Sequence, residues 1–299
     1  MGDDTDRSRL ANLVRYPSGG VPRGPLLESR EEPGDGYVME TLAWTSTIGE
    51  RVPAIVLRPA APGPYPALLY CHAHGGRYDI GKHELIEGRS GLLGPLGPLL
   101  ARTGVVVLCV EMPAFGERAE PGESARAKER LWRGDTLFGA MLRDLGQGLH
   151  HLRHRPEVDP TRIAAFGISM GAAHAFWMAA LEPRITRVAH FCAYADLDTL
   201  IRSGSHDRHG HYMTVPGLLE HFSTGAICGL IAPRPQLIAI GARDPLTPPA
   251  AVATALVETR KAYRAAGSLD ELTILEEPEV GHQETPSFRQ GLLDFLAQL

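Results

Sequence analysis

The sequence predicts an α/β fold with a doubly wound, mostly parallel sheet, and three observations support this prediction. Short apolar runs alternate with longer helical stretches over most of the 299 residues, which is typical of consecutive strand–helix–strand units. These runs, such as residues 105–110, are continuous, as expected for strands that helices cover on both faces. The run at residues 163–168 turns at Ser169 into an alanine-rich helix through Gly-Ile-Ser-Met-Gly, a strand–turn–helix signature.

Composition and charge limit the class of partner. The sequence is 43% hydrophobic and 22% charged, with a net charge of −5, so it can bury a sizeable core. Because neither sign of charge forms a long run, we expect no nucleic acid or membrane partner and a small molecule instead. The N-terminus lacks an apolar signal core and no later segment approaches the length of a membrane span, which predicts a cytoplasmic location.

The cysteines are predicted to be buried free thiols. None of them forms the C-x-x-C spacing of a zinc or redox site. The first three lie in apolar, strand-like runs, where a thiol packs as a small hydrophobic group. The four residues are Cys71, Cys109, Cys192 and Cys228.

The first 36 residues are rich in charge, glycine and proline. We expect them to form an extended arm that wraps its own domain or, in a homo-oligomer, a partner subunit. Residues 37–299 are predicted to form a single domain. Its first two β-rich runs, at residues 37–46 and 52–58, are joined by Ile48-Gly49-Glu50 into an antiparallel hairpin at the edge of the sheet.

Strands and helices alternate from there. We predict parallel strands at residues 66–72, 105–110, 163–168, 187–192, 236–240 and 272–275. Helices are predicted in a stretch ending near residue 99 and at residues 137–153, 250–266 and 288–299. One interval, residues 196–234, is too long for a simple connection in a compact domain. It is predicted to be a cap-like insertion over the active site, before the seventh strand.

Ser169, at the turn of the strand–turn–helix segment, is the predicted nucleophile. Gly167 and Gly171 let neighbouring backbone pass closely, and the tight turn holds the serine hydroxyl in the open. The first amides of the helix, beginning with Met170 N–H, are then aimed at the space above Ser169, where they would stabilise an oxyanion. The alternative is a serine that only caps the helix.

A serine nucleophile needs a general base and a carboxylate that orients this base. Asp244 follows the strand at 236–240 in the loop GARDPLTPP, and His282 follows the last predicted strand in VGHQE. Both positions lie where open α/β sheets build their sites, at the carboxyl ends of strands. We therefore predict that His282 accepts the Ser169 proton and that Asp244 orients His282.

A second oxyanion donor is expected in the run His72-Ala-His-Gly-Gly-Arg77, which follows the strand at 66–72. Glycines at this place let the backbone approach the substrate oxygen, so we predict that Gly75 and Gly76 provide the donor region, without choosing between their N–H groups. The alternative is a glycine-rich turn that does not contact the substrate.

The motifs HAHGG, GISMG, GARDPLTP and EVGH, in the chain order Ser169, Asp244, His282, resemble those of α/β-hydrolases of the esterase and dienelactone-hydrolase-like branch. The resemblance covers residues 38–299 and implies an eight-stranded sheet and ester hydrolysis through an acyl-enzyme, without a cofactor. Dienelactone hydrolases proper carry a cysteine at the elbow, so their lactone specificity does not carry over to Ser169. Acetyl-ester hydrolases similar to acetyl xylan esterases are the closer chemical comparison.

The substrate pocket is predicted to involve the insertion. An apolar helix over residues 215–227 would form a wall of the pocket, unless it only packs on the domain. His206, His209 and His211 have a spacing that could bind a metal, but a triad needs none, so we favour pocket-lining roles and no metal. The candidate pocket residues are His74, Arg77, His209, His211 and Leu218.

Together these features predict a serine esterase for a small-molecule ester, with a short-chain or acetyl ester favoured. Thioesterase, lactonase and peptidase activities remain open because they use the same triad. A hydrolase-like binding protein without catalysis is the alternative from another class.

Overall fold

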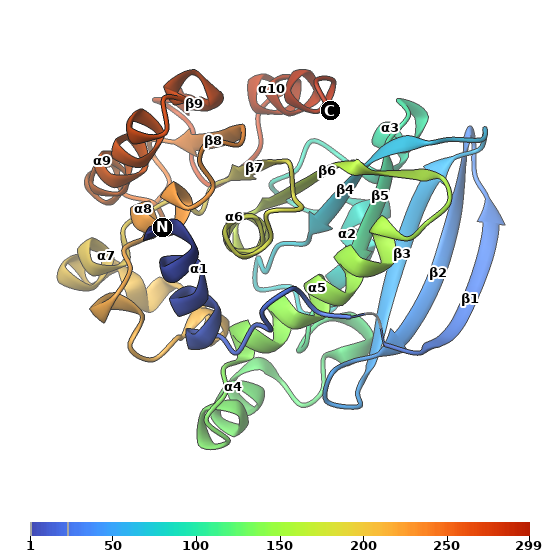
Figure 1. Cartoon of the computed structure of the whole chain (residues 1–299), viewed down its shortest axis with the longest axis horizontal. Coiled ribbons are helices and arrows are strands. Elements are labelled where there is room, and N and C mark those ends of the chain that lie inside the picture. Colours follow the sequence, from blue (N-terminus) through green and yellow to red (C-terminus); the bar gives the residue numbers. More distant parts are fainter. Residues whose placement is uncertain (1, 23) are drawn as a thin grey trace.

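In a computed structural model, which describes residues 2–22 and 24–299, the chain is organised around one mixed sheet (Figure 1). The nine strands found in the described residues have the order β1-β2-β3-β5-β4-β6-β7-β8-β9. Their bounds are β1 Leu26–Pro33, β2 Tyr37–Thr45, β3 Arg51–Pro59, β4 Tyr65–Cys71, β5 Val106–Val110, β6 Val158–Ile168, β7 Arg187–Phe191, β8 Gln236–Gly241 and β9 Leu272–Glu277.

The sheet is mostly parallel, with an antiparallel edge at its N-terminal side. Strands β1, β2, β3 and β5 pair antiparallel in that order, whereas β5, β4, β6, β7, β8 and β9 pair parallel. The α/β fold, the edge hairpin and the parallel strands are therefore confirmed. The connection between β7 and β8 holds the long insertion, at the predicted place in the chain.

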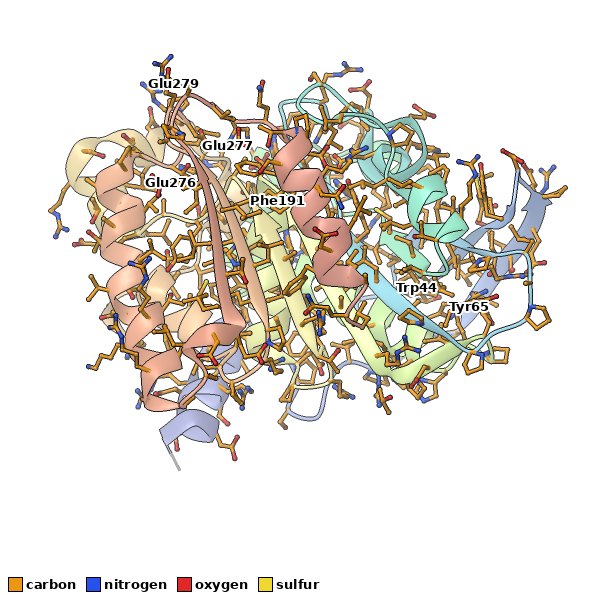
Figure 2. The ribbon with its side chains drawn as sticks, turned by 90° about the horizontal axis from the view of Figure 1, so that it is seen from above. Trp44, Tyr65, Phe191, Glu276, Glu277 and Glu279 are labelled. Atoms are coloured by element: carbon orange, nitrogen blue, oxygen red, sulfur yellow. The ribbon has the colours of Figure 1, made fainter. Side chains whose placement is uncertain are left out.

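Helices cover both faces of the sheet, as Figure 1 shows. Alternate residues of β4 enter different cores: Leu69 packs with α1, α5 and α6, whereas Leu68 packs with α3 and α10. Phe191 of β7 lies between the central strands and α10 (Figure 2), with its ring 5.6 Å from that of Phe288. The helices are α1 Gly2–Leu13, α2 Glu84–Glu87, α3 Gly97–Arg102, α4 Glu123–Trp132, α5 Leu137–Arg153, α6 Met170–Leu181, α7 Leu197–Ser203, α8 Thr224–Gly229, α9 Pro249–Ala265 and α10 Pro286–Leu296.

The N-terminal region corrects two predictions. Residues 1–36 do not form an extended arm throughout, because helix α1 and strand β1 lie within them. Strand β1 also makes the sheet nine-stranded rather than eight-stranded. Its sequence, LLESREEP, is almost entirely exposed, so it joins the edge through backbone pairing and carries none of the apolar pattern by which buried strands are recognised.

Helix α1 packs on its own chain. Leu10 in the helix and Val14 just after it are fully buried, and Arg7 Nε donates to the Ala180 carbonyl of α6 at 2.8 Å. Further along, the Tyr16 hydroxyl donates to Glu182 at 2.6 Å. These contacts anchor the described part of the arm to the helix that follows Ser169. Self-association through this arm stays a prediction.

The insertion between β7 and β8 contains α7, α8 and several short 3₁₀ turns. The prediction of one helix over residues 215–227 is wrong except at its end, where residues 224–227 belong to α8. Pro216 is followed by Gly217 with a φ of +75°, a left-handed conformation that ends helical geometry. A turn over Leu218–Glu220 follows, and α8 begins only after Ser223, whose hydroxyl accepts from Ala226 N at 3.0 Å.

Two composition-based predictions can be compared with the structure. The four cysteines are free and buried, as predicted. Among the described residues, no helix has both the length and the apolar character needed to cross a bilayer.

Candidate active site

The turn between β6 and α6 places Ser169 in a strained backbone conformation. Its φ of +57° and ψ of −125° lie in a backbone region that residues other than glycine rarely adopt. Two glycines make the turn possible: a Cβ on Gly171 would lie 1.9 Å from the Cys71 carbonyl oxygen, and a Cβ on Gly167 would lie 2.2 Å from the backbone of Gly171. Substitution of either glycine would therefore push β4 and the turn apart.

Ser169 is anchored by its backbone rather than by its side chain. Its N–H donates to the Phe191 carbonyl at 2.9 Å, which joins the turn to the end of β7. The hydroxyl makes no capping hydrogen bond to α6, so the helix-capping alternative has no support in the structure. The side chain is left facing a cavity that it helps to line.

Asp244 and His282 meet across the loops that follow β8 and β9. His282 Nδ1 donates to Asp244 Oδ2 at 2.6 Å, and the other carboxylate oxygen accepts from Leu246 N at 2.8 Å. Asp244 is 1% exposed, whereas the His282 side chain is 28% exposed. Because Nδ1 carries the donated proton, the neutral imidazole leaves Nε2 free to accept one.

Cys192, the residue after β7, connects Ser169 with this pair. It lines the same cavity as Ser169, and its sulfur lies within 4.8 Å of ligand atoms of Asp244 and His282. The Sγ donates weakly to the Gln283 carbonyl at 3.7 Å. Burial, together with the Asp244 charge, raises the pKa of the Cys192 thiol to about 12, so it stays protonated at neutral pH. The protonated Cys192 thiol therefore lies near Asp244 and His282 and shares the cavity wall with Ser169.

The predicted histidine cluster does not form a comparable group. Among the described residues, the set with three potential ligand atoms within 4.8 Å is Cys192, Asp244 and His282. His206, His209 and His211 are not part of it. This set consists of the hydrogen-bonded Asp244–His282 pair and the neighbouring Cys192 thiol.

The loop after β4 contains the N–H groups that were predicted as oxyanion donors. Gly75 and Gly76 both have positive φ, at 51° and 67°, but the Gly76 N–H donates to His74 Nδ1 at 3.0 Å and is occupied. The N–H groups of His74 and Gly75 donate to no other described residue. Met170 N–H, in the first turn of α6, is likewise without a described partner, as expected at a helix start. His74 N–H was not among the predicted donors.

A buried ion pair holds this loop against the sheet. Glu84 accepts from Ala73 N at 2.9 Å and from the Tyr70 hydroxyl at 2.8 Å, and it pairs with Arg89 at 3.0 Å. Arg89 in turn donates to the His74 carbonyl at 3.1 Å. Burial raises the pKa of Glu84, although Arg89 and the hydrogen bonds act in the opposite direction. Nothing in the local sequence distinguishes Glu84 from a surface glutamate.

We expect Glu84→Gln to lower kcat by about tenfold to a hundredfold with a much smaller change in KM. The substitution removes the charge that holds Arg89 and weakens the bond to Ala73 N, so the loop amides lose their alignment with the reacting oxygen. Steady-state kinetics on a short-chain nitrophenyl ester would measure the effect. The exposed Glu87→Gln is the matched control, and equal kcat values for the two variants would contradict this positioning role.

His74 and Arg77 do not line the cavity beside Ser169. His74 Nε2 donates to Glu123 at 2.7 Å, and the same carboxylate accepts from the N–H of Tyr212, in the insertion, at 2.7 Å. Through Glu123, the His74 side chain therefore connects the loop after β4 to the insertion. Arg77 is 58% exposed and pairs with Asp79.

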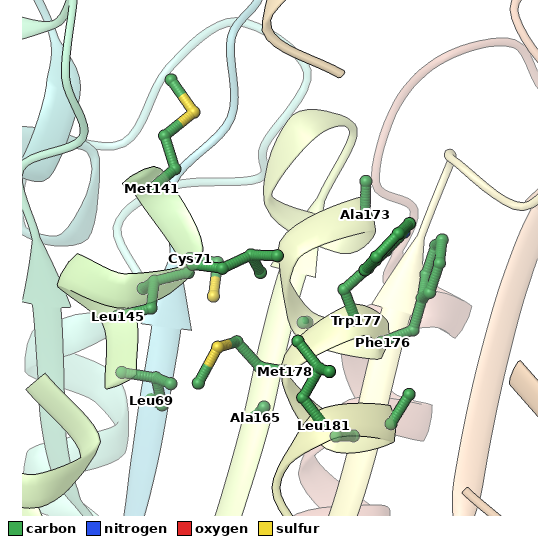
Figure 3. Packing of buried hydrophobic residues seen from close by; sticks show 14 of the residues in the cluster. Leu69, Cys71, Met141, Leu145, Ala165, Ala173, Phe176, Trp177, Met178 and Leu181 are labelled. Atoms are coloured by element: carbon green, nitrogen blue, oxygen red, sulfur yellow. The ribbon is translucent and has the colours of Figure 1, made fainter. Parts of the chain in front are cut away.

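The cavity beside Ser169 has a volume of about 40 Å³. His209 and Leu218 line it, as predicted, whereas His211 lines a neighbouring cavity instead. Phe176 and Trp177 project from the side of α6 away from Leu69 (Figure 3). Thr224 and Ile227, from the stretch predicted as a wall of the pocket, also line it. The remaining wall is mainly apolar and was not identified from the sequence: Phe138, Ala173, Phe176, Trp177, Cys192, Ala193, Ala195, Leu197, Leu200, Tyr212, Met213 and Leu246.

Comparisons with known proteins agree with this arrangement. The model of the dienelactone hydrolase family matches residues 52–206, just over half of the chain. A relative from Bacillus subtilis (strain 168), named "putative hydrolase YtaP", is 38% identical over 272 residues, which span 90% of this chain and 89% of the relative. This alignment therefore extends well beyond the strand–turn–helix segment around Ser169.

Solved structures share the fold at low sequence identity. Acetyl xylan esterase 1 from Thermoanaerobacterium sp. JW/SL YS485 matches with a TM-score of 0.68 and 18% identity, over 100% of this chain and 93% of that one. A glucuronoyl esterase from Solibacter usitatus matches with a TM-score of 0.64 and 13% identity, over 97% and 91% of the two chains. The fold, the family match and the relative together lead to one conclusion. The chain belongs to the dienelactone hydrolase family and is a carboxylic ester hydrolase with the α/β-hydrolase fold.

Proposed function

We propose that the protein is a serine hydrolase that cleaves short-chain esters, above all acetyl esters, through an acyl-enzyme on Ser169. The observation that carries this proposal is the Asp244–His282 pair, joined at 2.6 Å with Asp244 buried. It lies at the same sheet edge as a serine held in a strained turn with no capping bond. An oriented histidine with a free Nε2 is what a serine hydroxyl requires to become a nucleophile.

In the proposed reaction, Ser169 Oγ attacks the ester carbonyl carbon and its proton passes to His282 Nε2. Asp244 keeps the imidazole in the required tautomer and stabilises the imidazolium. The N–H groups of Met170 and of His74 or Gly75 hold the negative oxygen. The bond from the carbonyl carbon to the alcohol oxygen then breaks, and His282 returns the proton to the departing alcohol. Water repeats the sequence, releasing the acid and restoring the Ser169 hydroxyl.

The size of the cavity supports a small acyl group. A volume of about 40 Å³ holds roughly three water-sized groups, at about 10–15 Å³ for each. An acetyl group fits this space, whereas a longer acyl chain would have to displace Phe138, Trp177 or Ile227, all of which are buried. The likeness to an acetyl xylan esterase agrees with this choice.

We expect Ile227→Ala to shift the acyl preference of the enzyme toward longer chains. The variant removes side-chain volume from the cavity wall, so kcat/KM for a butyrate ester should rise about tenfold relative to the acetate ester. Kinetics over nitrophenyl esters from acetate to octanoate would measure this ratio. A parallel series of thioester, lactone and amide substrates would show whether the triad also accepts those classes.

Ile231→Ala is the matched control for that experiment. Ile231 is as buried as Ile227 and lies just after α8, but it does not line the cavity. Both variants should lose stability by about 2–5 kcal/mol through the loss of buried methyl groups. An unchanged butyrate-to-acetate ratio in Ile227→Ala, or an equal change in both variants, would show that the acyl group does not occupy this cavity.

A further inference from the structure

A second cavity, of about 340 Å³, adjoins the one beside Ser169 and is lined entirely by the insertion. Four residues line both cavities and so form the boundary between them: Leu197, His209, Met213 and Leu218. Nothing in the proposed acyl transfer uses the second cavity. It is several times larger than the first, and it includes the exposed apolar side chains of Ile201 and Leu219 at its outer wall.

His209 lies at this boundary and has a polar atom without a hydrogen-bond partner among the described residues. Its Nε2 is buried and has no hydrogen-bond partner among the described residues. Buried polar atoms are nearly always paired, so an orphaned one in a cavity wall indicates a ligand or water partner. Burial lowers the pKa of His209, although a backbone hydrogen bond with Leu246 and the Asp244 charge act the other way. A neutral imidazole nitrogen either donates or accepts, and a hydroxyl group complements both tautomers.

The rest of the second cavity has an apolar side and a polar side. Leu197, Ile201 and Leu219 contribute apolar surface, and Asp207 and Thr214 contribute oxygen atoms. No lysine or arginine is among the described residues that line it. Asp207 therefore makes the cavity less favourable for an anionic group, because no lining lysine or arginine offsets its charge. An uncharged ligand with hydroxyl groups fits this lining best.

We infer that the second cavity binds the alcohol part of the ester, that this alcohol is uncharged and hydroxylated, and that His209 Nε2 hydrogen-bonds one of its hydroxyls. The inference rests on the proposed function. The acyl group stays bound to Ser169 after the first step, which suits the small cavity. The alcohol leaves at that point, which suits the larger cavity with exposed residues in its wall.

A pair of esters tests the hydrogen bond. Glycerol 1-monoacetate and propyl acetate share an acyl group and a three-carbon alcohol and differ in two hydroxyls. We expect the native enzyme to favour the glycerol ester by about tenfold or more in kcat/KM, since a site built for a hydroxyl discriminates against its absence. In His209→Phe, this ratio should fall to about one. His221→Phe, an exposed position in the insertion outside both cavities, should keep the native ratio.

A second substitution tests which part of the ester occupies the cavity. Thr214→Trp would fill it, and we expect the ratio of kcat/KM for cyclohexyl acetate to that for methyl acetate to fall about tenfold. The ratio of ethyl butyrate to ethyl acetate should not change. Thermal unfolding of each variant, with the exposed Thr254→Trp as a control, shows that the chain is folded.

The outcomes separate this inference from the proposed function. An unchanged glycerol-to-propyl ratio in His209→Phe, or a change in acyl preference in Thr214→Trp, overturns the inference while ester cleavage by Ser169 stands. Cleavage of propyl acetate that is equal in the native enzyme and in Ser169→Ala overturns the proposed function, and the inference falls with it.

Discussion

Ser169→Ala is expected to lower kcat for a short-chain nitrophenyl ester by about 10⁶-fold, to the residual rate that binding and the oxyanion donors can support. The Ser169 hydroxyl makes no capping hydrogen bond to α6, and alanine differs from serine only by that oxygen. The loss should therefore appear in kcat, with little change in stability. Initial rates, corrected for spontaneous hydrolysis, and thermal unfolding would measure both quantities.

Covalent labelling provides the complementary measurement. A fluorophosphonate should modify the native protein at Ser169 and leave Ser169→Ala unmodified, because only an activated serine attacks phosphorus. Ser124→Ala, at an exposed position on α4, is the matched control and should retain native rates and labelling. Turnover by Ser169→Ala at the rate of Ser124→Ala would refute the assignment of the nucleophile.

Asp244→Asn is expected to lower kcat by about 10⁴-fold while leaving the fold intact. In the native chain, Asp244 Oδ2 accepts the proton of His282 Nδ1 at 2.6 Å, while Oδ1 accepts from Leu246 N. The asparagine keeps its carbonyl oxygen for Leu246 N and presents an NH₂ group to His282. Nδ1 must then accept, so the ring proton moves to Nε2, where it blocks proton transfer from Ser169.

The pH profile distinguishes this tautomer effect from a general loss of structure. If the orientation of His282 alone is disturbed, thermal stability and KM should stay close to native values while kcat falls. Activity should partly return at high pH, where hydroxide can replace the missing base. Asp270→Asn, at an exposed position before β9, is the control. Near-native kcat in Asp244→Asn would mean that another carboxylate orients His282.

The parallel strands could be recognised from the sequence because they are buried on both faces. Their apolar runs, such as that of β5, do not depend on which helices cover them. Strand β1 lacked this signal, since it lies at the sheet edge with exposed polar side chains. The insertion was also misread between residues 215 and 227. There, Leu218 lines the cavity from a 3₁₀ turn and Ile227 lines it from the short helix α8, and local composition does not distinguish one long helix from this arrangement.

The loop after β4, proposed to hold the oxyanion, shows why part of the candidate site could not be predicted. Its position after β4 follows from the order of motifs, but the N–H that remains available depends on where His74 Nδ1 and Glu84 lie. Glu84 and Glu123 reach the loop from other elements, at sequence distances of 11 and 49 residues. Such contacts leave no periodic pattern in the sequence.

By itself, the sequence predicted the strand–turn–helix segment around Ser169, the candidate nucleophile in it and its proposed acid–base partners. The backbone passes so closely at Gly167 and Gly171 that neither position admits a side chain. The carboxyl ends of parallel strands meet at one edge of the sheet. Both constraints can be recognised from short sequence motifs. Only the tertiary structure decided which loop amides are free and how large the two cavities are. Those properties arise from non-local packing, in which residues such as Phe138, His209 and Ile227 converge from separate elements.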